Sequence, residues 1–237
     1  MNHQVLGILG GMGPLASCAF LQTVYEENIK GQLEQNYPNV ILHSMSSVPD
    51  RTASFKQRAE DAFLEILIAN LRSLVNVNVS KIIICCFTSH CLLHHFPDDI
   101  SDKIVSLVDI TARELARQRQ PALLLASLGT YQKGLFENAG SCQAIKELIV
   151  IPTEPDQHRI HQIIYERLKP GTEVASVYPL VKSLLEKYQV NTFIAGCTEF
   201  HLLVRYLIAN NIDDIIFIDP LLTIARNLEE IINGCDE

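Results

Sequence analysis

The 237-residue chain has few basic residues and no hydrophobic run long enough to cross a membrane. Nineteen Lys and Arg stand against 27 Asp and Glu, and the formal net charge of −8 argues against nucleic-acid binding as the main function. Glycines interrupt the short apolar run near the start of the chain, and the apolar stretch 62–79 carries Glu65 and Arg72. Neither a membrane segment nor a targeting segment is therefore expected.

The chain also lacks a disulfide framework, a linker and a long disordered segment. Its seven cysteines are odd in number and have no framework spacing, and no signal peptide precedes them. These features predict reduced thiols and a cytoplasmic location. No stretch rich in Pro, Gly and Ser divides the sequence, and its charged residues, 19% of the total, are interspersed.

What the sequence does contain is an alternation of short apolar runs with longer helical patterns. This alternation favours a parallel α/β sheet, and runs without polar alternation fit strands that are covered on both faces. A single helix is expected over Phe55–Leu74. The predicted strands are Val5–Leu9, Asn39–Met45, Lys81–Cys86, a further strand at Ile104–Leu107, and then Ala122–Ala126, Ile149–Pro152, Asn191–Ala195 and Ile215–Ile218.

The two halves of the sequence are alike in plan. In each half, one strand ends in a glycine-containing turn, at 10–14 and 129–130, and a later strand ends in a cysteine followed closely by threonine. This similarity predicts two similar domains that face each other. We place the chain crossovers near residues 109 and 215, so that residues 1–109 plus 216–237 form the first domain and residues 110–215 form the second.

The most informative residues are the two cysteines at equivalent strand ends. Cys86 ends an apolar strand, and Thr88 or Ser89 is expected to cap the following helix. Cys197 has the same setting, followed by Thr198 and Glu199. Either cysteine alone is readily explained as a buried structural residue. Two thiols facing one ligand from opposite sides suit a reaction in which one removes a proton from carbon and the other protonates the opposite face.

Two other loops carry candidate ligand-binding residues. Arg51 follows the second strand and can bind a carboxylate through two parallel hydrogen bonds, although a surface ion pair with Asp50 explains it equally well. Gly11, Gly13 and Ala16 match the dinucleotide fingerprint, but Pro14 interrupts it and no acidic residue ends the second strand. No Walker lysine follows the glycines either, so a nucleotide cofactor is not expected.

A cluster of cysteines and histidines raises the alternative of a metal site. Its members lack the paired spacing of a zinc knuckle, so no metal site is predicted, and His94 and His95 are expected at an exposed helix end. The cluster comprises Cys85, Cys86, His90, Cys91, His94 and His95.

Taken together, these motifs resemble the aspartate/glutamate racemase superfamily, and its aspartate racemase branch most closely. The resemblance covers nearly the whole chain, and the order and spacing of the motifs make it specific. It rests on Gly7–Pro14, Pro49–Thr52, Cys86–His90, Ser127–Thr130, Tyr165–Lys169, Gly196–Glu199 and Ile218–Pro220.

The resemblance implies an α/β fold of two pseudo-symmetric domains, each a mainly parallel sheet flanked by helices, with the active site in the cleft between them. It also implies a homodimer that uses no pyridoxal phosphate, metal or nucleotide. Cys86 and Cys197 would be the catalytic pair in the interconversion of L- and D-aspartate or glutamate. The residues expected to bind the substrate are Met12, Arg51, Thr88, Thr130, Lys169, Thr198 and Glu199.

One position departs from the pattern of the family. Phe87 stands where the family usually has asparagine, directly after the first cysteine. Asparagine can hydrogen-bond to a substrate and phenylalanine cannot, so the identity of the substrate stays open. Two alternatives also stay open, namely a related isomerase or decarboxylase of a small dicarboxylic acid, and a non-catalytic amino-acid binding protein.

Overall fold

The computed structural model describes residues 4–29, 31, 33–171 and 173–233 and contains two parallel sheets. The first sheet has the order β2-β1-β3 and the second has the order β5-β4-β6-β7, so the first strand of each half lies between the second and the third. This shared order confirms the predicted α/β fold of two similar halves. The strands are β1 (Val5–Gly10), β2 (Asn39–Ser44), β3 (Lys81–Ile84), β4 (Ala122–Ala126), β5 (Ile149–Val150), β6 (Thr192–Gly196) and β7 (Ile216–Ile218).

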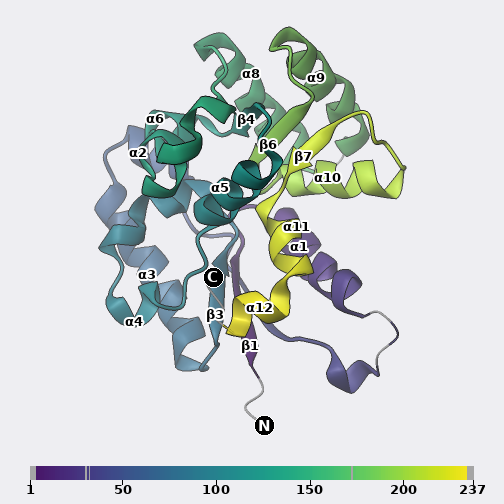
Figure 1. Cartoon of the computed structure of the whole chain (residues 1–237). Coiled ribbons are helices and arrows are strands. Elements are labelled where there is room, and N and C mark those ends of the chain that lie inside the picture. Colours follow the sequence, from purple (N-terminus) through teal and green to yellow (C-terminus); the bar gives the residue numbers. More distant parts are fainter. Residues whose placement is uncertain (1–3, 30, 32, 172, 234–237) are drawn as a thin grey trace.

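Helices flank both sheets, as Figure 1 shows. The α-helices are α1 (Pro14–Asn28), α2 (Arg51–Lys56), α3 (Glu60–Asn76), α4 (Asp98–Ser101), α5 (Leu107–Gln118), α6 (Leu128–Gln132), α7 (Leu135–Asn138), α8 (Glu154–Ile163), α9 (Val174–Lys187), α10 (Phe200–Ala209), α11 (Pro220–Arg226) and α12 (Leu228–Asn233). Three 3₁₀ segments, η1 (Glu34–Asn36), η2 (Phe87–His95) and η3 (Gly140–Leu148), and one π-helical turn, η4 (Ile164–Leu168), complete the set. Among the described residues, none of the helices is both long enough and apolar enough to span a bilayer.

Two expected elements differ in the structure. The helix expected over Phe55–Leu74 is divided into α2 and α3, because Arg58 adopts a left-handed conformation with φ of 57° between them. The strand expected at Ile104–Leu107 is wrong. Ile104 makes a single parallel bridge to Ile82, and the side chain of Ser106 then accepts a hydrogen bond from the Asp109 backbone N–H at 3.1 Å, which starts α5.

The chain leaves the second sheet at the end of β7. Because β7 pairs with β6, the second sheet extends to Ile218, three residues beyond the boundary expected at residue 215. The next helix, α11, packs against α1 of the first half and against α5, as Figure 1 shows. The domain division itself stays a prediction, and residues 234–237 of its first domain lie outside the described residues.

Buried apolar side chains form three clusters that alternate along the strands. Leu6 and Ile8 of β1 share one cluster with Leu124 of β4, so this cluster runs through both halves. Leu9 belongs to a second cluster beneath the first sheet, and Leu123 belongs to a third beneath the second sheet. Successive side chains of a strand point to opposite faces, so each sheet contributes to the shared cluster and to one of its own.

Candidate active site

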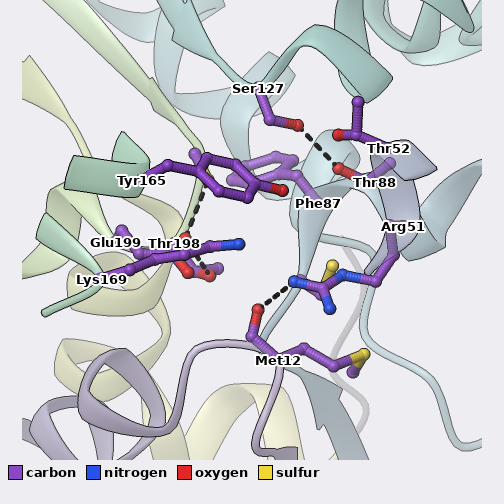
Figure 2. Close-up of a pocket in the computed structure, with 12 residues that line it drawn as sticks. Met12, Arg51, Thr52, Phe87, Thr88, Ser127, Tyr165, Lys169, Thr198 and Glu199 are labelled. Carbon is purple, nitrogen blue, oxygen red and sulfur yellow. Dashed lines mark hydrogen bonds between the residues drawn. The ribbon is translucent and has the colours of Figure 1, made fainter. Parts of the chain in front are cut away.

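A small pocket lies where the carboxyl ends of the two sheets approach each other. Its lining side chains leave about 10 Å³ of free volume, roughly the space of one water molecule. Figure 2 shows side chains from both halves converging on it. The lining residues are Met12, Arg51, Thr52, Cys86, Phe87, Thr88, Ser127, Tyr165, Lys169, Cys197, Thr198 and Glu199.

The two cysteines enter the pocket from equivalent strand ends. Cys86 follows β3 and Cys197 follows β6, and each of these strands is the third of its half. Cys86 is 6% exposed and Cys197 is partly buried. All six cysteines that the structure describes are free thiols, and Cys235 lies outside the described residues. The fold therefore brings together the two sulfurs that the sequence singled out.

The expectation that Thr88 or Ser89 caps a helix is wrong. Within the part of the chain that the structure describes, no side chain caps η2, which is a 3₁₀ helix beginning directly after Cys86. The hydroxyl of Thr88 instead hydrogen-bonds to Ser127 and Thr130 at 3.0 Å each, and Ser89 donates to the sulfur of Met12 at 3.6 Å. Both hydroxyls are therefore hydrogen-bonded to residues from other segments of the site.

Thr130 supports the pocket from behind rather than lining it. It is 1% exposed and lies 3.3 Å from Ser127, so these two residues of the second half form a hydroxyl cluster with Thr88 of the first half. Thr198 makes a similar bridge, donating to the backbone carbonyl of Cys85 at 3.2 Å. These bonds fix the two halves relative to each other at the site.

Arg51 is the first residue of α2 and is 7% exposed, so a surface ion pair does not explain it. Its guanidinium donates to the carbonyl of Pro49 at 3.2 Å and to the carbonyl of Met12. Burial lowers the pKa of Arg51, but the neighbouring charges of Cys86, Asp50 and Glu199 outweigh that effect and raise the pKa above its ordinary value. A permanent positive charge thus faces the pocket beside Cys86.

Asp50 binds residues of the second half. Its carboxylate caps α2 by accepting from the Ala53 backbone N–H at 2.9 Å, and it also accepts from the hydroxyl of Tyr165 at 2.5 Å. Burial raises the pKa of Asp50, but the Tyr165 and Ala53 hydrogen bonds and the nearby cations lower it overall. Lys169 lies 3.5 Å from the same carboxylate.

The π-helical turn η4 carries Tyr165 and ends directly before Lys169. A hydrogen bond of 2.8 Å from the Lys169 backbone N–H to the Ile164 carbonyl closes this wider turn, a feature often found at functional sites. The Lys169 ammonium lies 3.4 Å from the centre of the Tyr165 ring. Figure 2 shows Lys169 and Arg51 pointing into the pocket from opposite sides, which suits a ligand with separated negative charges.

Cys197 contacts the carboxyl group of Glu199. Its Sγ donates to Oε2 of Glu199 at 2.8 Å, and Glu199 is 2% exposed. Burial first, and then the Glu199 carboxylate, raise the pKa of the Cys197 thiol well above its ordinary value. The thiol is therefore the stable form of Cys197.

The glycine loop is filled by groups of the protein itself. A Cβ on Gly13 would lie 2.3 Å from Oε1 of Glu199, and a Cβ on Gly11, whose φ is +90°, would lie 2.4 Å from the Met45 backbone. The glycines thus make room for a carboxyl group and a neighbouring strand end, which explains their presence without a dinucleotide.

The histidines near Cys86 have structural environments. His90 is 4% exposed, and its ring bonds to the carbonyl of Cys86 at 3.0 Å and to the backbone N–H of Leu107 at 3.1 Å. His94 and His95 are exposed at the end of η2, as expected. Across the described ranges, no three His, Cys, Asp or Glu side chains group as ligands of one metal ion.

Sequence reasoning did not assign four lining residues to the site: Thr52, Phe87, Ser127 and Tyr165. Tyr165 lies four residues before Lys169, a spacing that places two side chains on one helix face and could have identified it. From the sequence, Phe87 stands out only as a departure from the family. It is 2% exposed and packs on Phe136, with ring centres 5.6 Å apart, so most of its side chain belongs to the shared core.

Comparisons with known proteins agree with this architecture. The chain is 21% identical over 210 residues to the broad specificity amino-acid racemase RacX of Bacillus subtilis, covering 86% of this chain and 88% of that protein. The structure matches an aspartate racemase of Picrophilus torridus with a TM-score of 0.79 at 20% identity, covering 97% of this chain and 94% of the other.

A more distant match extends to the glutamate racemases. The glutamate racemase of Francisella tularensis, solved with D-glutamate, matches with a TM-score of 0.64 at 13% identity, covering 99% of this chain and 82% of that one. The family model described as Asp/Glu/hydantoin racemase matches residues 9–228. The expected resemblance is thereby confirmed, and the chain belongs to the Asp/Glu/hydantoin racemase family.

Proposed function

We propose that this chain racemises a small α-amino acid, with aspartate and glutamate as the first candidates, by a two-base mechanism that uses Cys86 and Cys197. The observation that carries the proposal is that both thiols line one small pocket from equivalent strand ends of opposite halves. A carbon held between them can lose its proton to one sulfur and receive a proton from the other, which inverts its configuration.

The charged side chains of the pocket supply the recognition that such a substrate needs. Arg51 binds one carboxylate with its planar pair of N–H groups, and Lys169 binds the second carboxylate of aspartate or glutamate. An α-proton is a weak acid, so the developing negative charge on the carbanion and its carboxylate must be stabilised. Fixed positive groups in a small, largely buried pocket provide this stabilisation.

The two sulfurs stand in unlike electrostatic environments. Cys86 lies near the positive charge of the Arg51 guanidinium, whereas Cys197 donates to the Glu199 carboxylate. Cys86 is therefore the base for the enantiomer whose α-proton faces it, and Cys197 is the acid on the opposite side. Roles are exchanged for the other enantiomer. The scheme assigns no step to a cofactor or a metal ion.

The aromatic surface of the pocket bears on which substrate side chains it accepts. Phe87 and Tyr165 add aromatic surface to the pocket, and the similar RacX protein is described as having broad specificity. Neutral amino acids therefore belong in the panel of substrates beside the acidic ones. We also propose that the enzyme is a homodimer, and that it works in the cytoplasm, where both thiols stay reduced.

The decisive experiment incubates the protein with each enantiomer of a panel of amino acids in D₂O. Deuterium incorporation at the α-carbon, followed by chiral analysis, is expected for aspartate, glutamate or a neutral amino acid. Release of carbon dioxide, or a constitutional isomer as product, would instead establish a decarboxylase or another isomerase. Thermal stabilisation by an amino acid without any α-proton exchange would indicate a binding protein and refute the proposal.

A further inference from the structure

The carboxyl group of Glu199 is buried beside a reacting sulfur, yet only half of it is hydrogen-bonded. Oε2 accepts from the Cys197 thiol at 2.8 Å and lies 3.5 Å from the hydroxyl of Thr198. Oε1 has no hydrogen-bond partner among the described residues, although Glu199 is only 2% exposed. A buried acceptor without a partner is costly, so such a group in a pocket calls for an explanation.

The carboxyl group of Glu199 lies close to the glycine loop. Oε1 points at Gly13, where a Cβ would approach it to 2.3 Å, so a side chain at this position would displace the carboxyl group from where it lies. The φ of Gly13 is −143°, which other residues also adopt, so the small size of the residue is what matters here. The first half of the chain thus accommodates a carboxyl group that the second half supplies.

We propose that Glu199 is a catalytic residue that exchanges a proton with Cys197, and so sets the protonation state of the whole cysteine pair. The inference rests on the proposed two-base racemisation and deepens it. Glu199 touches Sγ of Cys197, which is a reacting atom in that scheme.

The protons balance in both directions. In one resting form both cysteines are thiols and Glu199 is a carboxylate. The S–H bond of Cys197 breaks as an O–H bond forms on Oε2, and the new thiolate takes the α-proton of the substrate. The S–H bond of Cys86 then breaks as a C–H bond forms on the opposite face. The products are a Cys86 thiolate, a Cys197 thiol and a Glu199 carboxylic acid, with the net charge unchanged.

The reverse direction uses this second resting form. The Cys86 thiolate, which lies beside the Arg51 guanidinium, removes the α-proton, and the Cys197 thiol protonates the other face. The Glu199 acid then returns its proton to the Cys197 sulfur. Cys197 is a thiol in both resting forms, which agrees with the burial and the adjacent carboxylate that raise its pKa. A thiolate and a carboxylate never have to stand side by side between turnovers, which avoids a costly repulsion between like charges.

The test compares Glu199→Gln with the wild type and with Glu186→Gln, which removes the same charge from an exposed site on α9. A glutamine has nearly the same shape but cannot accept the thiol proton. We expect racemisation by Glu199→Gln to fall by about 100-fold or more, the range of general acid–base catalysis, equally from both enantiomers. Glu199→Asp should recover part of the activity, and Glu186→Gln should match the wild type.

A second readout is independent of activity. The rate at which iodoacetamide alkylates Cys197, followed by mass spectrometry as a function of pH, reports the fraction of thiolate. Loss of the Glu199 charge should move the midpoint for Cys197 down by about one pH unit or more, while Glu186→Gln leaves it in place. A variant with more thiolate at Cys197 and yet less racemisation is the specific signature of a proton acceptor.

The outcomes separate the two proposals. A wild type that exchanges no α-proton refutes the racemase proposal, whatever Glu199 does. A wild type that racemises, together with a Glu199→Gln variant within about three-fold of it, refutes the role of Glu199 alone, because a base contributes at least 100-fold or so. An unchanged alkylation midpoint for Cys197 in Glu199→Gln also overturns the proposed proton exchange.

Discussion

Tyr165 donates its hydroxyl hydrogen to the Asp50 carboxylate at 2.5 Å, and this bond joins the second half of the molecule to the first at the rim of the pocket. It also partly neutralises Asp50 and so leaves the nearby Lys169 ammonium, 3.5 Å from the same carboxylate, more available to a ligand. This one hydrogen bond thus affects both the contact between the two halves at the pocket and the positive charge that Lys169 offers to a ligand.

Tyr165→Phe tests this relationship. Without the hydroxyl, Asp50 attracts Lys169 more strongly, so KM for a dicarboxylic substrate should rise by about ten-fold, equivalent to ~1.4 kcal/mol, with a much smaller change in kcat. Steady-state kinetics measure both constants.

A matched control exists elsewhere on the surface. Tyr178, Lys182 and Asp214 repeat the same trio of residue types, and Tyr178 donates to Asp214 at 2.8 Å. Tyr178→Phe should leave KM unchanged. A Tyr165→Phe variant with wild-type KM would show that the bond has no role in substrate binding.

The cysteine pair predicts a specific pattern of defects. Cys86→Ser and Cys197→Ser should each reduce racemisation by about 100- to 10,000-fold, because a hydroxyl is a far weaker acid than a thiol. Each variant should still exchange the α-proton of the one enantiomer that faces its remaining cysteine, with retention of configuration. Proton NMR in D₂O measures this exchange. Cys18→Ser, at an exposed site, should behave as the wild type, and full activity in either pocket variant would exclude the pair.

Arg51→Lys keeps the charge but removes the planar fork. The carbonyls of Met12 and Pro49 then lose a donor, and a carboxylate loses one of two parallel bonds. We expect KM to rise by about ten-fold or more, since a hydrogen bond to a charged group contributes about 1.5–3 kcal/mol. Arg72→Lys is the control, because Arg72 forms an exposed pair with Asp99 at 2.6 Å. Equal kinetics for the two variants would contradict the role of Arg51.

Phe87→Asn restores the residue usual in the family but should not simply improve the enzyme. The ring of Phe87 is buried against Phe136 and His90, so its loss leaves a cavity and a buried amide. The free energy of unfolding should fall by about 3 kcal/mol or more, as for other Phe truncations in cores. Urea denaturation measures this, and Phe87→Leu should cost much less. An unchanged stability would show that Phe87 serves the pocket rather than the core.

His90 makes stability depend on pH. Burial lowers its pKa from 6.5 to about 4, against the opposing effect of its backbone hydrogen bonds. Between these values the unfolded chain binds a proton at His90 that the folded protein does not bind. Stability should therefore rise as pH increases from about 4 to 6.5, by up to roughly 3 kcal/mol from this residue. Urea unfolding across this range should show a shallower slope for His90→Gln, and equal slopes would refute the assignment.

The sequence predicted the elements that short-range patterns specify. Apolar runs located the strands, apart from the false one at Ile104–Leu107, and the cysteine motifs after Ile84 and Gly196 located the two sulfurs in one pocket. The pairing of Asp50 with Tyr165 could not be predicted from the sequence, because these residues are 115 positions apart and their contact depends on how the two halves pack together. The contact between Glu199 and Cys197 depends on a side-chain rotamer, and the room for it comes from Gly13 in the other half.

Local backbone geometry also limited what could be predicted from the sequence. Nothing in the helical spacing around Arg58 signals its left-handed conformation, so one helix was expected where α2 and α3 stand. The hydroxyl of Thr88 had an obvious local use as a cap, but the cluster with Ser127 and Thr130 satisfies it instead. Tertiary contacts overrode the local preference in that case.

The apolar cluster shared by Leu6, Ile8 and Leu124 has a consequence for how the molecule can be divided. Each half completes the interior of the other, so a fragment cut near residue 109 would expose one side of its sheet to water. We expect such fragments to aggregate when they are produced singly and the intact chain to melt in one transition. The two halves are thus similar in architecture, yet each depends on the other for its stability.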